Sequence, residues 1–251
     1  MKTGKRIADI HAHILPGVDD GAKDIEEALE MLRIACREGI TDMIVTPHYQ
    51  SGRFFTPGDV LREKTAGLQS LVEQEGIPIR LYPGTEIYFR SGLEERLETR
   101  QLATMNGSEF VLVEFSPVEE FSYMRNALEE LLGLGYHPIL AHVERYRCMR
   151  EDRKRVKELR GMGCGIQANA GSIAGEYGYL TGSYLHQLLK EQLVDYVGTD
   201  AHSAIHRTPR MKKCAERLYR KYGEEYAERL LYKNAESDLL KKNAKEEPKD
   251  D

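Results

Sequence analysis

Short apolar segments recur along this chain, and most of them end in a histidine, aspartate or glutamate side chain. From His13 through His48, Glu86, Glu114 and His142 to Asp200, the gaps are 35, 38, 28, 28 and 58 residues. A β-strand with its crossover helix takes about 30 residues, so each interval is typical of one βα unit and the last of about two. The carboxyl ends of parallel strands meet at one mouth, where barrel enzymes keep their chemistry. The nine candidates are His11, His13, Asp20, His48, Glu86, Glu114, His142, Asp200 and His202.

Hydrophobic periodicity supports an alternation of strands and helices. The clearest helix pattern follows a candidate N-cap at Asp24, with apolar residues from Ile25 to Cys36 on one face and Gly39 as a stop. Seven apolar segments are predicted to be strands: 7–11, 42–46, 79–86, 110–114, 138–141, 165–168 and 195–199. Further helices are predicted over 59–75, 121–134, 152–162, 184–191 and 210–222.

This order predicts an α/β fold built on a parallel sheet. Seven strands, at least six of them ending in a candidate ligand, favour closure into a barrel with the ligands at its C-terminal mouth. An open doubly wound sheet is the alternative, but its site would draw on fewer strands. Residues 1–233 are expected to form one domain. Residues 234–251 are dense in charge and are predicted to be a partly disordered C-terminal tail.

Composition limits the classes of protein that remain. The 251 residues are 41% hydrophobic, which suffices for a sizeable core, and no apolar segment approaches the ~18 residues of a membrane span. The first residues lack the apolar region of a secretion signal, and the four cysteines form no CxxC pair. We therefore expect a cytoplasmic protein with reduced thiols and no membrane insertion. The net charge of −5 weighs against a nucleic-acid partner, although a cationic mouth can still attract phosphate.

His11 and His13 are one residue apart at the end of a predicted strand. Alternate side chains of a strand point the same way, so both imidazoles can reach one ion; two surface histidines are the alternative. Asp19 and Asp20 follow in a glycine-flanked turn. We favour Asp20 as the ligand, with Asp19 as a residue that caps the turn.

Glu86 and Glu114 each end an apolar strand, where an isolated carboxylate is costly to bury unless it is paired or coordinates a metal. One glutamate alone fits an ion pair. Two beside strand-end histidines are better explained by ions, and a glutamate can bridge two of them. His48 and His142 follow the same logic, with a hydrogen-bonded core histidine as the alternative. The Asp-Ala-His segment that begins at Asp200 repeats the alternation of the first histidine pair.

Nine candidate ligands are too many for one ion. They would fill the coordination of two ions well, and of three if Asp20, His48 and His202 form a separate set. Mixed nitrogen and oxygen ligands favour Mn²⁺, Fe or Zn²⁺ over Ca²⁺ or Mg²⁺. The pattern is typical of a metallohydrolase.

Arg145 and Arg207 lie close in sequence to these ligands. A guanidinium group matches phosphate bidentately, so both are candidates for substrate binding. Solvated arginines that pair with acids such as Glu144 are the alternative.

The segment from Cys214 to Arg220 has the Cys–Arg spacing of cysteine-based tyrosine phosphatases. Strong helix formers separate the two residues, however, and Glu216 would repel a phosphate. We interpret this segment as an amphipathic helix without a catalytic role.

The motifs HAHILPGVDDGAKD, VTPHY, GTEIY, VEFSP, AHVERY, QANAGS and TDAH together resemble the polymerase-and-histidinol-phosphatase (PHP) superfamily. Within it, they are similar to the manganese-dependent protein-tyrosine phosphatases of Gram-positive capsule and exopolysaccharide loci. The resemblance covers about residues 7–207. HILPGxDDG and AHxERY are specific to this branch, whereas HxH and DAH mark only the superfamily.

The resemblance implies a distorted seven-stranded barrel of the PHP type that holds three ions, with Mn²⁺ as the metal. It implies a first ion at His11, His13, Glu86 and Asp200, a second at Glu86, Glu114 and His142, and a third at Asp20, His48 and His202. Arg145 and Arg207 match arginines implicated in phosphate binding. The implied substrate is the phosphotyrosine tail of a cognate bacterial tyrosine kinase.

The expected reaction is hydrolysis of a phosphomonoester at metal ions ~3.5–4 Å apart, without a covalent cysteine intermediate. A small-molecule phosphatase such as histidinol phosphatase is the nearest alternative. A nucleic-acid phosphodiesterase is the second, and the acidic net charge disfavours it. A metal-stabilised interaction module without turnover is the non-enzymatic alternative.

Overall fold

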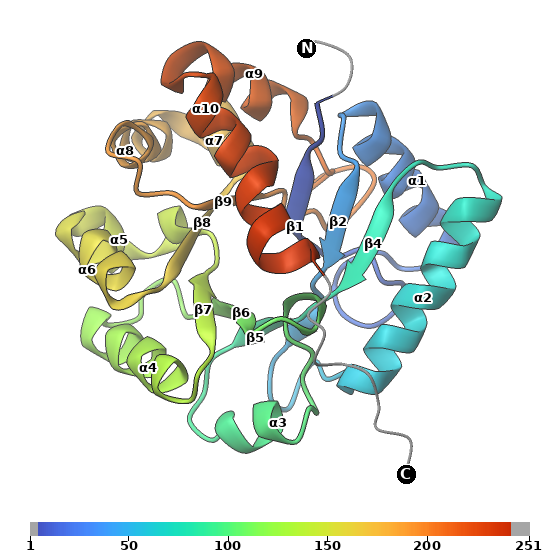
Figure 1. The fold of residues 1–251 in the computed structure, drawn as a ribbon, viewed down its shortest axis with the longest axis horizontal. Coiled ribbons are helices and arrows are strands. Elements are labelled where there is room, and N and C mark those ends of the chain that lie inside the picture. The colour runs from blue at the N-terminus through green and yellow to red at the C-terminus, as the bar shows by residue number, and fades with distance from the viewer. Residues whose placement is uncertain (1–4, 242–251) are drawn as a thin grey trace.

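The computed structural model describes residues 5–241, in which parallel strands lie at the centre and helices surround them (Figure 1). The strands are β1 (Ala8–Ala12), β2 (Asp42–Val45), β3 (His48–Tyr49), β4 (Arg80–Pro83), β5 (Glu86–Tyr88), β6 (Phe110–Glu114), β7 (His137–Leu140), β8 (Gly165–Asn169) and β9 (Tyr196–Gly198). They form a three-stranded sheet, β1-β2-β4, and a six-stranded sheet, β3-β5-β6-β7-β8-β9. All strand pairs in both sheets are parallel, which confirms the predicted α/β class.

Among residues 5–241 the hydrogen bonding defines nine strands in place of the predicted seven. The difference arises because two continuous stretches of extended chain are each interrupted in the middle. The predicted strand over 79–86 divides into β4 and β5 at Gly84, where an added Cβ would lie 2.9 Å from the Ile44 side chain. Alongside it, β2 and β3 are separated at Pro47, which has no N–H to donate to the ladder. The hydrogen bonds from Gly84 N to Val45 O and from Glu86 N to Pro47 O still hold the two paths together.

The sheet curls until its first and last strands meet. Asp200 N donates to His11 O at 2.7 Å, and His13 N donates to Ala201 O at 2.8 Å. Ala12 and Ala201 form a parallel bridge beyond the end of β9. The ends of β1 and β9 therefore lie side by side, although 190 residues separate them in sequence.

Helices cover the outside of the curled sheet (Figure 1). The longer ones are α1 (Ile25–Arg37), α2 (Gly58–Gln74), α4 (Phe121–Gly133), α6 (Lys154–Met162), α8 (Gly178–Lys190) and α9 (Lys212–Tyr222), and each overlaps a predicted helix. The shorter ones are α3 (Glu94–Glu98), α5 (Arg147–Glu151), α7 (Ala170–Ala174) and α10 (Glu224–Glu228), with 3₁₀ turns at Met105–Gly107 and Val143–Arg145 and π-helical segments at Arg229–Lys233 and Glu236–Leu240. Asp24 caps α1 as expected, since its side chain accepts from Glu27 N at 2.9 Å. In the part of the chain that the structure describes, no helix is long and apolar enough to cross a membrane.

The start of the predicted charged tail is instead a packed helical segment. Ala235 and Leu239 are buried against the residues that fill the inside of the curled sheet, among them Ile10 and Ile139. Asn106 Nδ2 also donates to Leu239 O at 2.9 Å. The sequence did not predict this buried face, because Ala235 and Leu239 form a single i, i+4 apolar pair among charged residues. The remaining tail residues, 242–251, lie outside the described part of the chain.

Replacing Leu239 by alanine is expected to lower the free energy of unfolding by about 2–5 kcal/mol, because it opens a cavity where the helical segment meets the sheet interior. Chemical denaturation measures this change. Lys241→Ala, at an exposed position in the same segment, serves as the control and is expected to change stability by less than about 0.5 kcal/mol. Equal stability of the two variants would show that the segment does not close the core.

Candidate metal centre

The nine candidate ligands gather at one end of the curled sheet: seven lie near or beyond the C-terminal end of a strand, and two begin the short strands β3 and β5 that continue the paths of β2 and β4. His11 lies in β1, His48 and Glu86 begin β3 and β5, Glu114 ends β6, His13 and Asp20 follow β1, His142 follows β7, and Asp200 and His202 follow β9. The expected convergence on one mouth is therefore found. It results from the parallel register, in which His48 pairs with Glu86, and Tyr88 pairs with Glu114.

Glu86 is at the middle of the cluster and is fully buried. Its Oε2 lies 3.1 Å from His11 Nε2, 3.3 Å from His13 Nε2 and 3.0 Å from His48 Nδ1, and its Oε1 lies 3.0 Å from His142 Nε2. Despite these short distances, Oε2 makes no hydrogen bond of acceptable geometry. Imidazole nitrogens and carboxylate oxygens that converge in this way are a donor set that suits divalent cations. The donor set therefore fits metal ions.

Among residues 5–241, three overlapping groups of donor atoms are compact enough to hold an ion, each with its atoms within 4.8 Å of one another. The groups are His11, His13 and Asp200; His48, Glu86 and Glu114; and His13, Asp20, His48 and His202. These groups contain eight of the nine candidates. The ninth is His142, whose Nε2 lies 3.5 Å from Glu114 Oε1.

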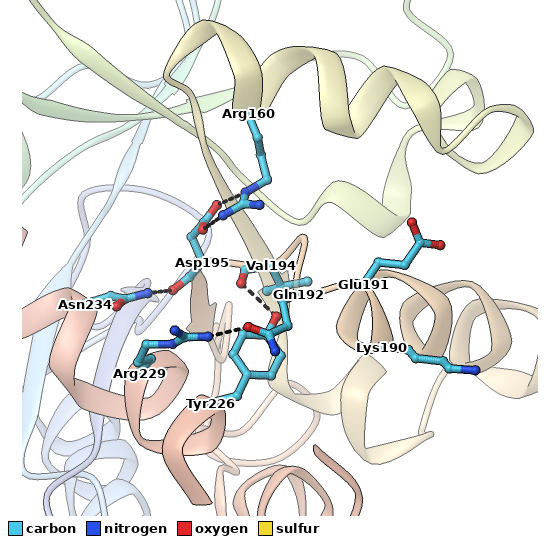
Figure 2. A pocket seen from close by; sticks show the side chains of 9 residues that line it. All are labelled: Arg160, Lys190, Glu191, Gln192, Val194, Asp195, Tyr226, Arg229 and Asn234. Atoms are coloured by element: carbon cyan, nitrogen blue, oxygen red, sulfur yellow. Dashed lines mark hydrogen bonds and ion pairs between the residues drawn. The ribbon is translucent and has the colours of Figure 1, made fainter. Parts of the chain in front are cut away.

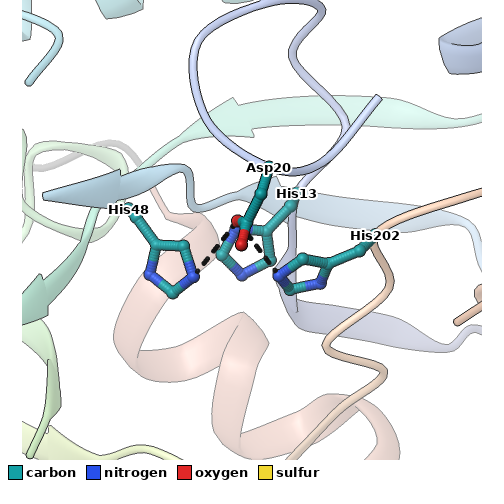
Figure 3. A group of neighbouring side chains, drawn as sticks. All are labelled: His13, Asp20, His48 and His202. Atoms are coloured by element: carbon teal, nitrogen blue, oxygen red, sulfur yellow. Dashed lines mark ion pairs between the residues drawn. The ribbon is translucent and has the colours of Figure 1, made fainter. Parts of the chain in front are cut away.

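Figure 3 shows the last of these groups, with the Asp20 carboxylate directed between two imidazole rings. Asp20 Oδ1 lies 3.6 Å from both His48 Nε2 and His202 Nε2. Burial and the charge on His13 lower the pKa of His202 to about 3. His202 is therefore a neutral imidazole at physiological pH, the form that binds metals.

Asp19 does not face the cluster and instead orients one of its members. Its Oδ2 lies 2.7 Å from His13 Nδ1 and accepts from the His48 backbone N–H at 2.9 Å, while Oδ1 accepts from Gly21 N. Burial alone would raise the pKa of Asp19, but the hydrogen bond and charge of His13 lower it to about 2. Of the two aspartates in the turn, Asp20 is the one whose carboxylate lies within a group of possible metal-binding atoms.

Asp19→Asn is expected to weaken Mn²⁺ binding by about 10–100-fold. The two oxygens of Asp19 meet three N–H donors, from His13, Gly21 and His48. Asparagine has only one such oxygen, so its NH₂ group would face at least one of these donors. Calorimetric titration of the metal-free protein measures the affinity. Asp24→Asn is a matched control, since asparagine caps a helix as well as aspartate does. Unchanged affinity in the Asp19 variant would mean that this carboxylate does not orient His13.

The field inside the cluster favours positive charge. Burial lowers the pKa of a histidine, but Asp19 and Glu86 outweigh it and raise the pKa of His13 to about 10. In the same way, Glu114 and Glu86 overcome burial and raise the pKa of His142 to about 9. Burial would raise the pKa of Glu86, but the surrounding imidazoles hold it well below its usual range. Divalent ions supply the same positive charge, so metal binding displaces protons from these histidines.

Arg145 and Arg207 both reach the cluster through Asp200. Arg145 Nη2 contacts Asp200 Oδ2, and Arg207 Nη2 lies 2.5 Å from Asp200 Oδ1. About a third of each arginine side chain is exposed, so both guanidinium groups also border the mouth. Both arginines thus pair with an acid, as the alternative held, and that acid is itself a candidate ligand.

Two ligand candidates have strained backbones. His142 has φ 32° and Asp200 has φ 54°, in the left-handed region that residues other than glycine rarely adopt. Such conformations cost about 1–3 kcal/mol each and cluster at functional sites. The sequence carried no signal for this strain.

Two buried amides of the site were missed by the sequence analysis. His142 N donates to Gln167 Oε1 at 2.7 Å, and Asn169 Nδ2 donates to Asp200 Oδ2 at 2.9 Å. A signal was present, because Gln167 and Asn169 alternate with apolar residues in QANAGS and so share one face of a strand.

The Cys214 segment forms helix α9, as the sequence predicted. Cys214 is completely buried, and burial raises the pKa of its thiol. A buried, protonated thiol is not a nucleophile.

A surface pocket of about 610 Å³ lies at the opposite ends of the strands, where Val194 and Asp195 precede β9 (Figure 2). Its polar groups largely satisfy one another. Arg160 binds Asp195 bidentately at 3.0 and 2.7 Å, and Tyr226 donates to Val194 O at 2.9 Å. The three donor groups found among residues 5–241 all lie elsewhere, at the mouth.

Comparison with known proteins agrees with this geometry. The family model for capsular polysaccharide synthesis, CpsB/CapC, matches residues 7–240. The tyrosine-protein phosphatase CpsB of Streptococcus agalactiae is 32% identical over 236 residues, which cover 92% of this chain and 97% of that protein. The tyrosine-protein phosphatase YwqE of Bacillus subtilis is 34% identical over 235 residues, which cover 94% and 91%.

Solved structures give the same relationship. The crystal structures of YwqE from Bacillus subtilis and CpsB from Streptococcus pneumoniae, described as unique metal-dependent tyrosine phosphatases, match with a TM-score of 0.83 and 33% identity over 88% of this chain and 90% of that chain. Histidinol phosphate phosphatase from Lactococcus lactis matches with a TM-score of 0.59 and 14% identity over 88% and 93%, which shows a shared fold alone. The family resemblance inferred from the motifs is thereby confirmed, and this chain belongs to the CpsB/CapC family of capsular polysaccharide synthesis.

Proposed function

We propose that this protein is a metal-dependent protein-tyrosine phosphatase that regulates the synthesis of capsular or extracellular polysaccharide. The observation that carries the proposal is the convergence of three ion-sized donor groups and two partly exposed arginines on one mouth. The relatives named as tyrosine phosphatases over almost their whole length support the same reaction. We also propose that the curled strands amount to a distorted seven-stranded barrel, with β2–β3 and β4–β5 each counted as one interrupted strand.

The cluster would hold two or three ions, with Mn²⁺ as the favoured metal and Fe or Zn²⁺ as alternatives. The proposed sets are His11, His13, Glu86 and Asp200 for the first ion, Glu86, Glu114 and His142 for the second, and Asp20, His48 and His202 for the third. When bound, such ions lower the pKa of water and withdraw charge from phosphoryl oxygens.

The residues around the mouth would bind and orient the phosphate. Charge grows on the three equatorial oxygens during in-line displacement, and Arg145 and Arg207 would stabilise it with donors that Asp200 already holds in place. The leaving phenolate of tyrosine has a pKa near 10, low for an oxygen leaving group, so the reaction needs no strong general acid. The buried Cys214 thiol takes no part.

The proposed substrate is the phosphotyrosine tail of a cognate bacterial tyrosine kinase. We place the protein in the cytoplasm, where its four unpaired cysteines would remain reduced.

A paired assay tests the reaction and the substrate together. Metal-free protein receives Mn²⁺ or a chelator and is then given a phosphotyrosyl peptide, histidinol phosphate or a nucleic-acid diester. We expect Mn²⁺-dependent release of phosphate from the peptide, loss of this release in His48→Ala, and full retention in Cys214→Ser. Preference for histidinol phosphate would move the function to small-molecule metabolism, and activity on none of these substrates would refute the phosphatase assignment.

A further inference from the structure

Two amide side chains are buried inside the curled sheet on strand β8. Gln167 is completely buried and Asn169 is 3% exposed. They are two residues apart, so both point to the interior, towards the metal ligands. A buried amide has two donors and an acceptor to satisfy, so its partners reveal how it is oriented.

A backbone group determines the orientation of the first amide. The His142 backbone N–H is 2.7 Å from Gln167 and can only donate, so the Gln167 atom that it meets must be the oxygen, Oε1. Gln167 Nε2 then points to Asn169 and donates to its Oδ1 at 2.9 Å. The Asn169 amide is in turn fixed with Nδ2 towards Asp200 Oδ2, also at 2.9 Å. The direction of every hydrogen bond in this chain follows from the first.

The same oxygen also selects the tautomer of His11. Gln167 Oε1 lies 3.2 Å from His11 Nδ1, and because this oxygen only accepts, Nδ1 must carry the proton. His11 Nε2 is then the nitrogen that carries the lone pair, and it faces the cluster, 3.2 Å from His13 Nε2 and 3.1 Å from Glu86 Oε2.

At the other end of the chain, Asn169 engages one oxygen of Asp200. Oδ2 receives the Asn169 N–H and also contacts Arg145. The second oxygen, Oδ1, contacts Arg207 and lies 3.7 Å from both His11 Nε2 and His13 Nε2. The amide pair therefore turns Oδ1 towards the nitrogens with which it would share an ion.

We propose that Gln167 and Asn169 are positioning residues that preset His11 and Asp200 for metal binding through one directed hydrogen-bond chain anchored on the His142 backbone. The inference rests on the proposed function only in taking the cluster to be a metal site. Partners behind the ligands typically contribute 10–100-fold to metal affinity. The amide pair would act on affinity without touching the substrate.

The test is a titration of the metal-free protein with Mn²⁺, in which electron paramagnetic resonance measures the concentration of the unbound ion. Gln167→Met keeps the length of the side chain but removes its hydrogen bonds, and we expect it to weaken Mn²⁺ binding about 10–100-fold. Asn106→Ala is the matched control, because this amide donates to Leu239 O at the opposite end of the strands. It is expected to change stability but to leave Mn²⁺ affinity within about twofold of the wild type.

A conservative variant separates positioning from a general structural role. Gln167→Glu retains an acceptor for the His142 N–H and for His11, so it is expected to bind Mn²⁺ more tightly than Gln167→Met at a similar stability. Should Gln167→Met fail to fold, Asn169→Ala replaces it, with an expected loss of about tenfold from the freed Asp200 carboxylate.

Wild-type affinity in both Gln167→Met and Asn169→Ala would overturn the inference, as would an equal loss in Asn106→Ala. If the wild type binds Mn²⁺ but hydrolyses no phosphotyrosyl peptide, the proposed function fails while this inference stands. If the wild type binds none of Mn²⁺, Fe²⁺ and Zn²⁺, both fail.

Discussion

Glu86→Gln is expected to reduce kcat/KM for a phosphotyrosyl peptide about 10³-fold, equal to about 4 kcal/mol of transition-state stabilisation. Glu86 Oε2 has three imidazole nitrogens within 3.3 Å, and Oε1 meets a fourth. An amide at this position removes the negative charge that proposed ions would share and directs N–H groups at nitrogen lone pairs. Steady-state kinetics with saturating Mn²⁺ measures the loss.

The control for this prediction is Glu38→Gln. Glu38 Oε2 accepts from the backbone N–H groups of Met211 and Lys212, away from the cluster, and glutamine retains an acceptor there. This variant is expected to keep wild-type kinetics. Activity of Glu86→Gln within tenfold of the wild type would show that this carboxylate bridges no ions.

Arg207→Ala is expected to lower kcat/KM about 10²–10³-fold, the usual effect of removing one donor that stabilises transition-state charge. The affinity for Mn²⁺, in contrast, is expected to increase. The Arg207 guanidinium lies 2.5 Å from Asp200 Oδ1, and removing this positive charge leaves Asp200 freer to bind a cation. Kinetics and Mn²⁺ titration on the same preparation therefore give effects of opposite sign.

Arg210→Ala is the control for this pair of measurements. Arg210 lies three residues further on, lines the same small pocket as Arg207, and is exposed. It is expected to retain activity within about twofold. A parallel loss of activity and Mn²⁺ affinity in Arg207→Ala would mean that this arginine supports the geometry of Asp200 and not the phosphate.

The regular spacing of the ligands made the site predictable. His48, Glu86, Glu114 and His142 lie at or just beyond the ends of predicted strands, and parallel strands in register must bring such positions to one mouth. This convergence could be predicted without knowing the hydrogen-bond partners of the ligands or the distances between them. Another local property, helix propensity, identified Cys214 as part of a helix, because its neighbours favour a helix over an anion-binding loop.

Other features depended on contacts between distant parts of the chain. The sequence favoured Asp20 over Asp19 as the ligand, but only the structure shows that Asp19 contacts His13 Nδ1 while Asp20 faces His48. Leu239 stands in a charged segment, and only the open end of the curled sheet makes it part of the core. The break between β4 and β5 likewise falls at Gly84, where Ile44 of a neighbouring strand leaves no room for a side chain.

The sequence by itself determined the fold class, the mouth and the chemical character of the site, because ligand types and βα spacing are local properties of the chain. The tertiary structure alone decided the orientation of each ligand: the tautomer of His11, the Asp200 oxygen that faces the imidazoles and the left-handed backbone of His142. These depend on hydrogen bonds from residues as far away as Gln167, and such partners have no fixed spacing in sequence.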